Sequence, residues 1–185
     1  MARIKGTSVI EIVRVLRKNK DAARALLPPE LHRYLEDRLL SSSWYPEEDY
    51  LTLLLALGRV LSPLVSGDVW SFLGHQGAVK DFTGIYSSVI RHGDPWGALS
   101  HLNAIWHIYR DSGTLSLDRT GPGSARVLLR DYPTACPEVC GTVSGYLRAV
   151  VELSGGTDVK VVLLRAPRMD VGPSEWSLEF GVPRK

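Results

Sequence analysis

The sequence predicts an α+β fold, in which N-terminal helices pack on a small four-stranded antiparallel sheet. Up to about Arg110 the apolar residues recur with the helical period, which is typical of amphipathic helices. After Gly113 the period changes to two in four short stretches, which is typical of half-buried strands. Because the helices precede the strands and tight turns join the strands, the pattern favours α+β over a parallel sheet with alternating helices. The expected order at the C-terminal end is strand, strand, helix, strand, strand.

Length and composition bound the class of protein. With 185 residues, 44% of them hydrophobic and 23% charged, the chain suits a single globular domain over residues 1–185. We expect a helical front half over residues 1–92 and a mixed half over residues 93–185. The net charge of +2 creates no strong field, so nucleic acid is not an expected partner.

The cysteines and the apolar runs predict where the protein resides. Two cysteines, Cys136 and Cys140, are too few for a disulfide framework and suit a reducing cytoplasm. Charged residues interrupt residues 1–20, which argues against a secretory signal. The run Leu51–Leu61 has about half the length needed to cross a bilayer and contains Arg59, so no membrane insertion is expected.

Glycines, prolines and caps delimit the expected helices. The first helix is amphipathic, with its apolar face over Val9–Leu16. Residues 67–91 are expected to form a helix that Gly74 and Gly77 break into two pieces. The segment His92–Pro95 ends one helix and starts the next, because it combines a glycine stop, an aspartate cap and a first-turn proline. Further helices are expected over residues 20–27, 31–39, 47–61 and 95–110.

A helix among the late strands carries a stripe of small residues. The strands are expected near residues 114–118, 125–130, 159–163 and 176–180, with a turn at 120–123. The helix Cys136–Leu153 carries Gly141, Gly145 and Ala149 at a spacing of four. Glycine inside a helix costs about 1 kcal/mol relative to alanine. The stripe therefore predicts close packing against another helix or against the sheet.

Four short motifs in the second half resemble one family of ligand-binding domains. The motifs are Trp106-x-x-Tyr109-x-x-Ser112-Gly113, Gly121-Pro122-Gly123, Cys140-x-x-x-x-Gly145-Tyr146 and Gly155-Gly156. Together they resemble the 4-vinyl-reductase-type domains, which share a fold with the haem-NO-binding domains and the TRAPP vesicle-tethering subunits. The resemblance runs from about Gly93 to the C-terminus. The front half, with Ser42–Pro46, is similar to a myxobacterial paralogous family of unassigned function, which we take as the nearest kin.

Some of the related domains bind zinc and others bind haem, each through its own residue pattern, and this chain departs from both patterns. The zinc-binding relatives use a cysteine ahead of the Gly-Tyr pair, then Glu-x-x-Cys, then another cysteine. Cys140 matches the first, but the other places fall on Arg165, Arg168 and Trp176, which supply neither carboxylate nor thiolate. The haem-binding relatives carry a Tyr-x-Ser-x-Arg clamp and a proximal histidine, and the nearest segment, Tyr109–Ser112, does not match. We therefore expect no metal, no haem and no other cofactor.

Aromatic residues are the candidates for a ligand pocket between the helices and the sheet. The candidates are Trp70, Phe82, Tyr86, Trp106, Tyr109 and Tyr146. Trp106 and Tyr109 are the strongest, because they fall on the motif helix that faces the ligand in the relatives. The alternative is a filled hydrophobic core, which is the usual role of such residues.

The leading functional hypothesis is a non-enzymatic sensory or scaffold domain in bacterial signalling, which binds a small hydrophobic ligand or a partner protein. Because many relatives dimerise through helices, a homodimer through the face Val9–Leu16 is also expected. The alternative is an enzyme acting on an aromatic or tetrapyrrole-like substrate, with His101, His107 or Cys140 as its titratable group. The sequence contains no Gly-x-Ser-x-Gly elbow, phosphate-binding loop or dinucleotide motif, so no catalytic residue is assigned.

Overall fold

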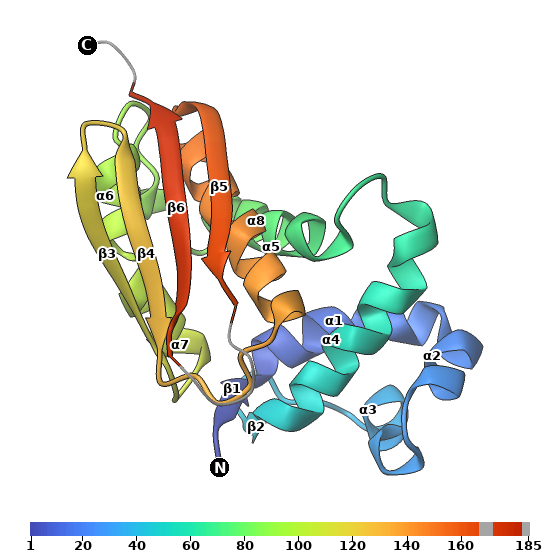
Figure 1. The fold of residues 1–185 in the computed structure, drawn as a ribbon. Coiled ribbons are helices and arrows are strands. Elements are labelled where there is room, and N and C mark those ends of the chain that lie inside the picture. The colour runs from blue at the N-terminus through green and yellow to red at the C-terminus, as the bar shows by residue number, and fades with distance from the viewer. Residues whose placement is uncertain (167–171, 183–185) are drawn as a thin grey trace. The chain divides into compact units, whose positions relative to one another are not determined.

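The computed structural model describes residues 1–166 and 172–182, which form two compact units (Figure 1). The N-terminal unit comprises Met1–Val69 and His107–Ser112, and the sheet unit comprises the described parts of Trp70–Trp106 and Gly113–Lys185. The α+β class and the four-stranded antiparallel sheet are confirmed. The contacts divide the chain near Val69, whereas the sequence suggested halves that meet near residue 92. That the two units fold as one domain stays a prediction.

Helices α1 and α4 form the core of the N-terminal unit. The apolar face Val9–Leu16 is buried, and α1 packs against α4 and against the short helices α2 and α3. This face is therefore used inside the chain, so a homodimer would need a different surface. The elements of the unit are β1 (Arg3–Lys5), α1 (Gly6–Lys18), α2 (Lys20–Leu26), α3 (Arg33–Glu36), β2 (Trp44–Pro46) and α4 (Glu47–Leu61), with 3-10 turns at Pro29–Leu31 and Ser62–Leu64.

The antiparallel pair β1–β2 was not expected from the sequence. Ile4 lies opposite Tyr45, and the side chain of Ile4 is fully buried. Strands of three residues are too short to display the alternation by which a strand is recognised. The pairing places β1 directly beside the start of α4, where the amide of Glu47 donates to the carbonyl of Ala2 at 3.0 Å.

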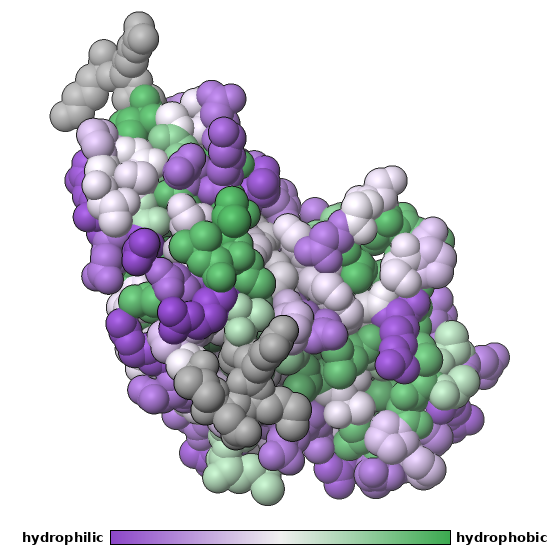
Figure 2. Space-filling view, viewed as in Figure 1, coloured by the Kyte–Doolittle hydropathy of each residue, from purple (hydrophilic) through white to green (hydrophobic). Residues whose placement is uncertain are grey.

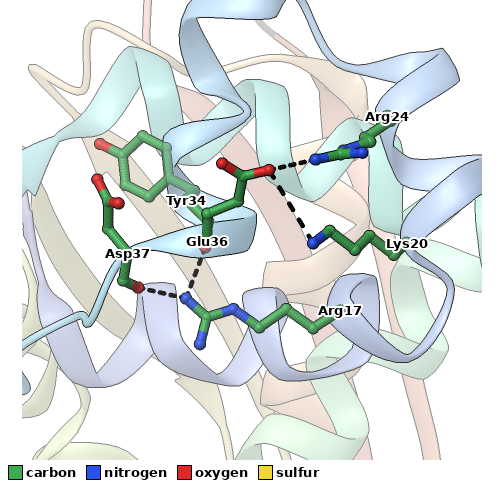
Figure 3. A network of polar contacts seen from close by, with 6 residues as sticks. All are labelled: Arg17, Lys20, Arg24, Tyr34, Glu36 and Asp37. Atoms are coloured by element: carbon green, nitrogen blue, oxygen red, sulfur yellow. Dashed lines mark hydrogen bonds and ion pairs between the residues drawn. The ribbon is translucent and has the colours of Figure 1, made fainter.

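Basic residues of α1 and α2 hold helix α3 in place (Figure 3). The guanidinium of Arg17 donates to the backbone carbonyls of Tyr34 and Asp37, at the carboxyl end of α3. Arg24 and Lys20 both form ion pairs with Glu36. Positive charge at the carboxyl end of a helix compensates its unpaired carbonyls.

Tyr34 links α3 to α4 and should control stability at alkaline pH. Its hydroxyl donates to Oδ2 of Asp49 at 2.7 Å, and burial followed by this bond raises the pKa of Tyr34 from 10.0 to about 12. A raised pKa in the folded state contributes stability below pH 10 that is lost as the pH rises towards 12. We expect Tyr34→Phe to cost about 1 kcal/mol at neutral pH. It should also flatten the loss of stability over that alkaline window, as urea unfolding at several pH values would measure.

The sheet unit contains the sheet in the order β3-β4-β6-β5, with all neighbouring strands antiparallel. Helix α8 packs on β5 and β6 (Figure 1), and the predicted order strand, strand, helix, strand, strand is found. The elements are α5 (Val69–Thr83), α6 (Pro95–Ser100), α7 (Leu102–Tyr109), β3 (Thr114–Gly121), β4 (Ser124–Arg130), α8 (Pro137–Leu153), β5 (Thr157–Arg165) and β6 (Ser174–Gly181), with a 3-10 turn at Ser87–Val89. The bounds of α5 and α7 extend across the division between the units.

Two helix boundaries differ from the expected ones. Helix α5 continues through Gly74 and Gly77, whereas a break was expected there. The segment expected as one helix to Arg110 is divided at His101 into α6 and α7. The cap at Asp94 is confirmed, because its Oδ1 accepts a hydrogen bond from the amide of Gly97 at 2.8 Å.

Among the described residues, no single helix is long and apolar enough to cross a bilayer. The consecutive segments Glu47–Leu64 and Val69–Thr83 reach that length and composition only as a bent pair.

Candidate functional site

Helices α5 and α8 cross with their backbones in contact. A Cβ atom placed on Gly145 would lie 1.8 Å from the carbonyl oxygen of Ser71, and one on Gly74 would lie 1.8 Å from that of Thr142. No side chain fits at either position. Gly145 therefore packs against another helix, which is one of the two alternatives that the stripe of small residues predicted. Gly74 is retained inside α5 for the same reason, although glycine weakens a helix.

Three of the aromatic candidates gather beside this crossing. The ring centroid of Phe82 lies 6.3 Å from that of Tyr86 and 5.9 Å from that of Tyr146. The hydroxyl of Tyr146 donates to Oδ2 of Asp81 at 2.9 Å, which ties α8 to α5. Phe82 is 3% exposed, whereas Tyr86 and Tyr146 are partly exposed. We call Phe82, Tyr86 and Tyr146 the aromatic group; its central ring is buried and its two outer rings are partly exposed.

Trp106 occupies a different place in the sheet unit. Its ring meets that of Tyr132 edge to face, with centroids 5.0 Å apart, and both residues are buried. The backbone at Gly113 passes close to both rings, since a Cβ there would lie 3.0 Å from Tyr132 and 3.2 Å from Nε1 of Trp106. Glycine also suits the φ of +75° at this position. Tyr132 was not among the candidates, and its position after a strand gave no signal of this contact.

Two further candidates, Trp70 and Tyr109, lie near the ends of helices. Trp70 lies in the first turn of α5 and is partly buried, and Tyr109 is the last residue of α7, within the N-terminal unit. The structure thus brings at least Phe82, Tyr86 and Tyr146 together. A role in ligand binding stays a prediction for each of them.

A buried carboxylate organises the N-terminal unit. The side chain of Glu47 is 1% exposed, and its Oε2 accepts a hydrogen bond from the hydroxyl of Ser112 at 2.8 Å. Nε of Arg110 lies 3.4 Å from Oε1 of Glu47, and its guanidinium lies 5.9 Å from the ring centroid of Tyr50. Burial raises the pKa of Tyr50, so its hydroxyl stays protonated beside these charges. A buried carboxylate requires such partners, since an unpaired one would be strongly destabilising.

Strand β1 fixes the same segment from the other side. Asp111 accepts from the backbone amide of Arg3 at 2.6 Å and from its Nε at 2.7 Å, and Ile4 forms a β-bridge with Arg110. Burial raises the pKa of Asp111, but the bonds from Arg3 outweigh it and hold the pKa below its ordinary value. Residues 110–112 are therefore bound by both α4 and β1.

The residues of this chain do not fit a haem group. None of the five histidines is buried. Nε2 of His32 lies 3.1 Å from the carbonyl of Leu27 and Nε2 of His75 lies 3.0 Å from Glu152, whereas an axial ligand needs a ring nitrogen directed at the iron. In the segment that most resembles a propionate clamp, the side chains of Arg110 and Ser112 already bind a carboxylate of the chain itself, that of Glu47.

The cysteines form no metal centre in the described part of the chain. Cys140 is buried, with its Sγ 3.4 Å from Oγ of Ser174, and Trp176 is a core residue whose indole donates to Ser144 at 2.9 Å. Arg165 lies in β5, and Arg168 is outside the described residues. Across residues 1–166 and 172–182, no three His, Cys, Asp or Glu side chains are placed to hold a metal.

Both thiols should react slowly in the folded protein. Burial raises the pKa of Cys136 to about 11 and also raises that of Cys140, which lowers the thiolate fraction at neutral pH. We expect a colorimetric disulfide reagent at pH 8 to label the partly exposed Cys136 slowly and to label Cys140 only after unfolding. Rapid labelling of Cys140 in the native state would contradict its burial, and a Cys136→Ser variant separates the two signals.

The fold matches that of H-NOX proteins over nearly the whole chain. A mutant of the Fe(II) unliganded H-NOX protein from K. algicida aligns with TM-score 0.69 and 13% identity, over 96% of this chain and 97% of that chain. A mutant H-NOX from T. tengcongensis gives 0.66 and 12%, over 96% and 97%. An oxygen-binding H-NOX domain related to soluble guanylate cyclases gives 0.62 and 12%, over 98% of both chains. No family model matches the chain, and no curated protein matches it by sequence.

These likenesses show the fold and confirm the haem-NO-binding part of the resemblance. Nearness to the myxobacterial paralogues, the 4-vinyl-reductase-type domains and the TRAPP subunits stays a prediction. The identities of 12–13% are too low for residue roles to be carried over from these structures.

Proposed function

We propose that this protein is a non-enzymatic sensory domain that binds a small hydrophobic ligand without haem and acts in bacterial cytoplasmic signalling. The observation that supports this most is the likeness to H-NOX structures over almost the full length of both chains. The H-NOX structures include an oxygen-binding domain related to soluble guanylate cyclases, so a ligand-sensing role is the natural one for the same fold. A protein partner would then read the state of the domain.

We do not propose gas sensing through haem, because no histidine is buried as an axial ligand would be and because Arg110 and Ser112 bind Glu47. A ligand without iron has to be held by apolar and aromatic contacts with a few polar groups. The aromatic group offers such contacts, because Tyr86 and Tyr146 are partly exposed around the buried Phe82. The hydrogen bond between Tyr146 and Asp81 supplies a polar edge. We therefore propose a small aromatic or lipid-like molecule as the ligand.

The decisive experiment compares protein produced with and without added haem precursor. We expect no Soret absorbance in either preparation. Native mass spectrometry of protein from its own host should show an added mass, and organic extraction should release one apolar compound. Returning that compound to stripped protein should raise the melting temperature, because a ligand that binds the folded state stabilises it. Stoichiometric haem, or a clean apo mass without a thermal shift from lipophilic compounds, would overturn the proposal.

Paired variants locate the ligand. We expect Tyr86→Ala to weaken retention of the extracted compound by about tenfold or more, since an aromatic contact of roughly 1.4 kcal/mol is lost. Phe72→Ala is the matched control, because Phe72 is an exposed aromatic residue of α5 outside the aromatic group. Equal retention by both variants would place the ligand elsewhere.

The enzymatic alternative receives less support. His101 belongs to the sheet unit and His107 to the N-terminal unit, and both are exposed. Cys140 is buried, and burial raises its pKa, which is opposite to the activation of a catalytic thiol. The non-enzymatic role is therefore the one we propose.

A further inference from the structure

The polar edge of the aromatic group is a carboxylate in the last turn of a helix. Asp81 lies near the carboxyl end of α5, and its Oδ2 accepts the hydrogen bond of 2.9 Å from the hydroxyl of Tyr146. Both side chains are partly exposed. A carboxylate is ordinarily ionised at neutral pH and then has only acceptor atoms. A ligand that reaches this edge therefore meets a negatively charged acceptor.

The position of Asp81 on α5 adds to this negative charge. The last carbonyl groups of a helix carry partial negative charge, so a cation is favourable beside them and an anion is not. Lys80 is the basic residue of the same turn, but its side chain is exposed, and adjacent positions on a helix do not face each other. The carboxylate and the helix end thus contribute the same sign of charge at one place.

The rings of the aromatic group make a third negative contribution. The amide of Tyr86 donates to the backbone carbonyl of Asp81 at 2.9 Å, which places Tyr86 directly after the end of α5. The rings of Tyr86 and Tyr146 are tilted by 54° and 60° against that of Phe82. The face of an aromatic ring is negative, and proteins use such faces to recognise organic ammonium groups. Carboxylate, helix end and rings all favour a cationic ligand.

We propose that the ligand of the aromatic group is a protonated amine with an aromatic or alkyl body, a specification that rests on the ligand-binding function proposed above. The ammonium group donates to the carboxylate of Asp81, as a charge-assisted hydrogen bond. The apolar body lies against the exposed parts of Tyr86 and Tyr146. A ligand with a carboxylate of its own meets Asp81 as a like charge, so fatty acids and aromatic acids are rejected.

Three probes with the same aromatic body test the charge of the ligand. Phenethylamine, phenethyl alcohol and hydrocinnamate are cationic, neutral and anionic at neutral pH. Their binding to the full chain is measured by isothermal titration calorimetry. We expect the amine to bind at least about tenfold more tightly than the alcohol, and hydrocinnamate to bind most weakly.

Replacing Asp81 with asparagine removes the charge and keeps the shape. The amide oxygen of Asp81→Asn can still accept from Tyr146, so the tie between α5 and α8 remains. We expect this variant to bind the amine and the alcohol within about twofold of each other, because only the amine loses an ionic partner. Asp118→Asn is the matched control, since Asp118 is an exposed aspartate of β3 and its loss changes the net charge equally.

Salt and a second surface variant provide further controls. Added salt should weaken binding of the amine to the wild type and leave the alcohol unchanged. Val162 and Leu164 of β5 are each 52% exposed, and Figure 2 shows a hydrophobic patch over this strand, which can also take up apolar probes. Val162→Ser should leave the affinity for all three probes unchanged.

The outcomes distinguish the charge of the ligand from the place where it binds. Equal binding of the amine and the alcohol, weakened alike by Tyr86→Ala, would overturn the amine and leave the ligand site in place. Probe binding that Tyr86→Ala does not weaken would overturn the site itself. A preference for the amine that persists in Asp81→Asn would overturn the role of Asp81. Absence of amine binding up to about 10 mM would overturn the ligand class.

Discussion

Replacing Gly145 with alanine should destabilise the protein by about 3 kcal/mol, at the upper end of overpacking effects. The added Cβ would lie 1.8 Å from the carbonyl oxygen of Ser71, so the obstacle is backbone and cannot rotate away. Helices α5 and α8 would have to separate, which also disturbs the aromatic group. Urea unfolding followed by circular dichroism would measure the loss.

A glycine in the same helix pair supplies the control. Gly77 lies inside α5, and a Cβ there meets no atom within 4 Å. We expect Gly77→Ala to stabilise the protein by about 0.5–1 kcal/mol, because alanine favours the helix and restricts the unfolded chain. Opposite signs for the two variants would establish that close packing, and not helix propensity, decides the effect at Gly145. Similar small effects at both positions would show that α5 and α8 do not cross closely.

Replacing Arg110 with methionine should have an effect of similar size, about 3 kcal/mol, by leaving the buried carboxylate without its ion pair. Glu47 would keep the hydrogen bond from Ser112 but lose the guanidinium beside it. Since Arg110 also bridges to Ile4 through its backbone, the side chain can be changed while the β-bridge remains. The unfolding free energy is again the quantity to measure.

A double variant separates the charge from the packing. We expect Glu47→Gln together with Arg110→Met to be within about 1 kcal/mol of the wild type, because no buried charge is then left unpaired. Recovery of stability in the double variant would show that Arg110→Met is destabilising because the buried carboxylate of Glu47 has lost its counter-charge. If the two losses simply add, the residues act independently and the buried pair does not organise the unit.

Much of the fold follows from local patterns. The change of period after Gly113 predicted the hairpin β3–β4 and the later strands, and the signal at His92–Pro95 predicted the cap at Asp94. Local rules failed where packing overrides them. Gly74 was expected to interrupt α5, yet the helix continues because α8 occupies the space that a side chain would need.

The candidate sites were less accessible to sequence reasoning. Phe82, Tyr86 and Tyr146 were among the candidates for one pocket, but the sequence could not show which of the six candidates meet, since Tyr146 lies on a different helix from Phe82. The cluster of Glu47 and Ser112 joins residues 65 positions apart, and Glu47 alone resembled an ordinary acidic residue in a first helical turn. No local spacing relates residues that are so distant along the chain.

The sequence by itself determined the secondary structure class, the order of the late elements and the small-residue stripe of α8, because these depend on the periodicity of neighbouring residues. Only the tertiary structure decided that the face Val9–Leu16 packs inside the chain, that Glu47 is buried with Arg110, and that β5 is at an edge. These features depend on which surfaces meet, and contact between distant segments is fixed by the burial of complementary groups rather than by local preference.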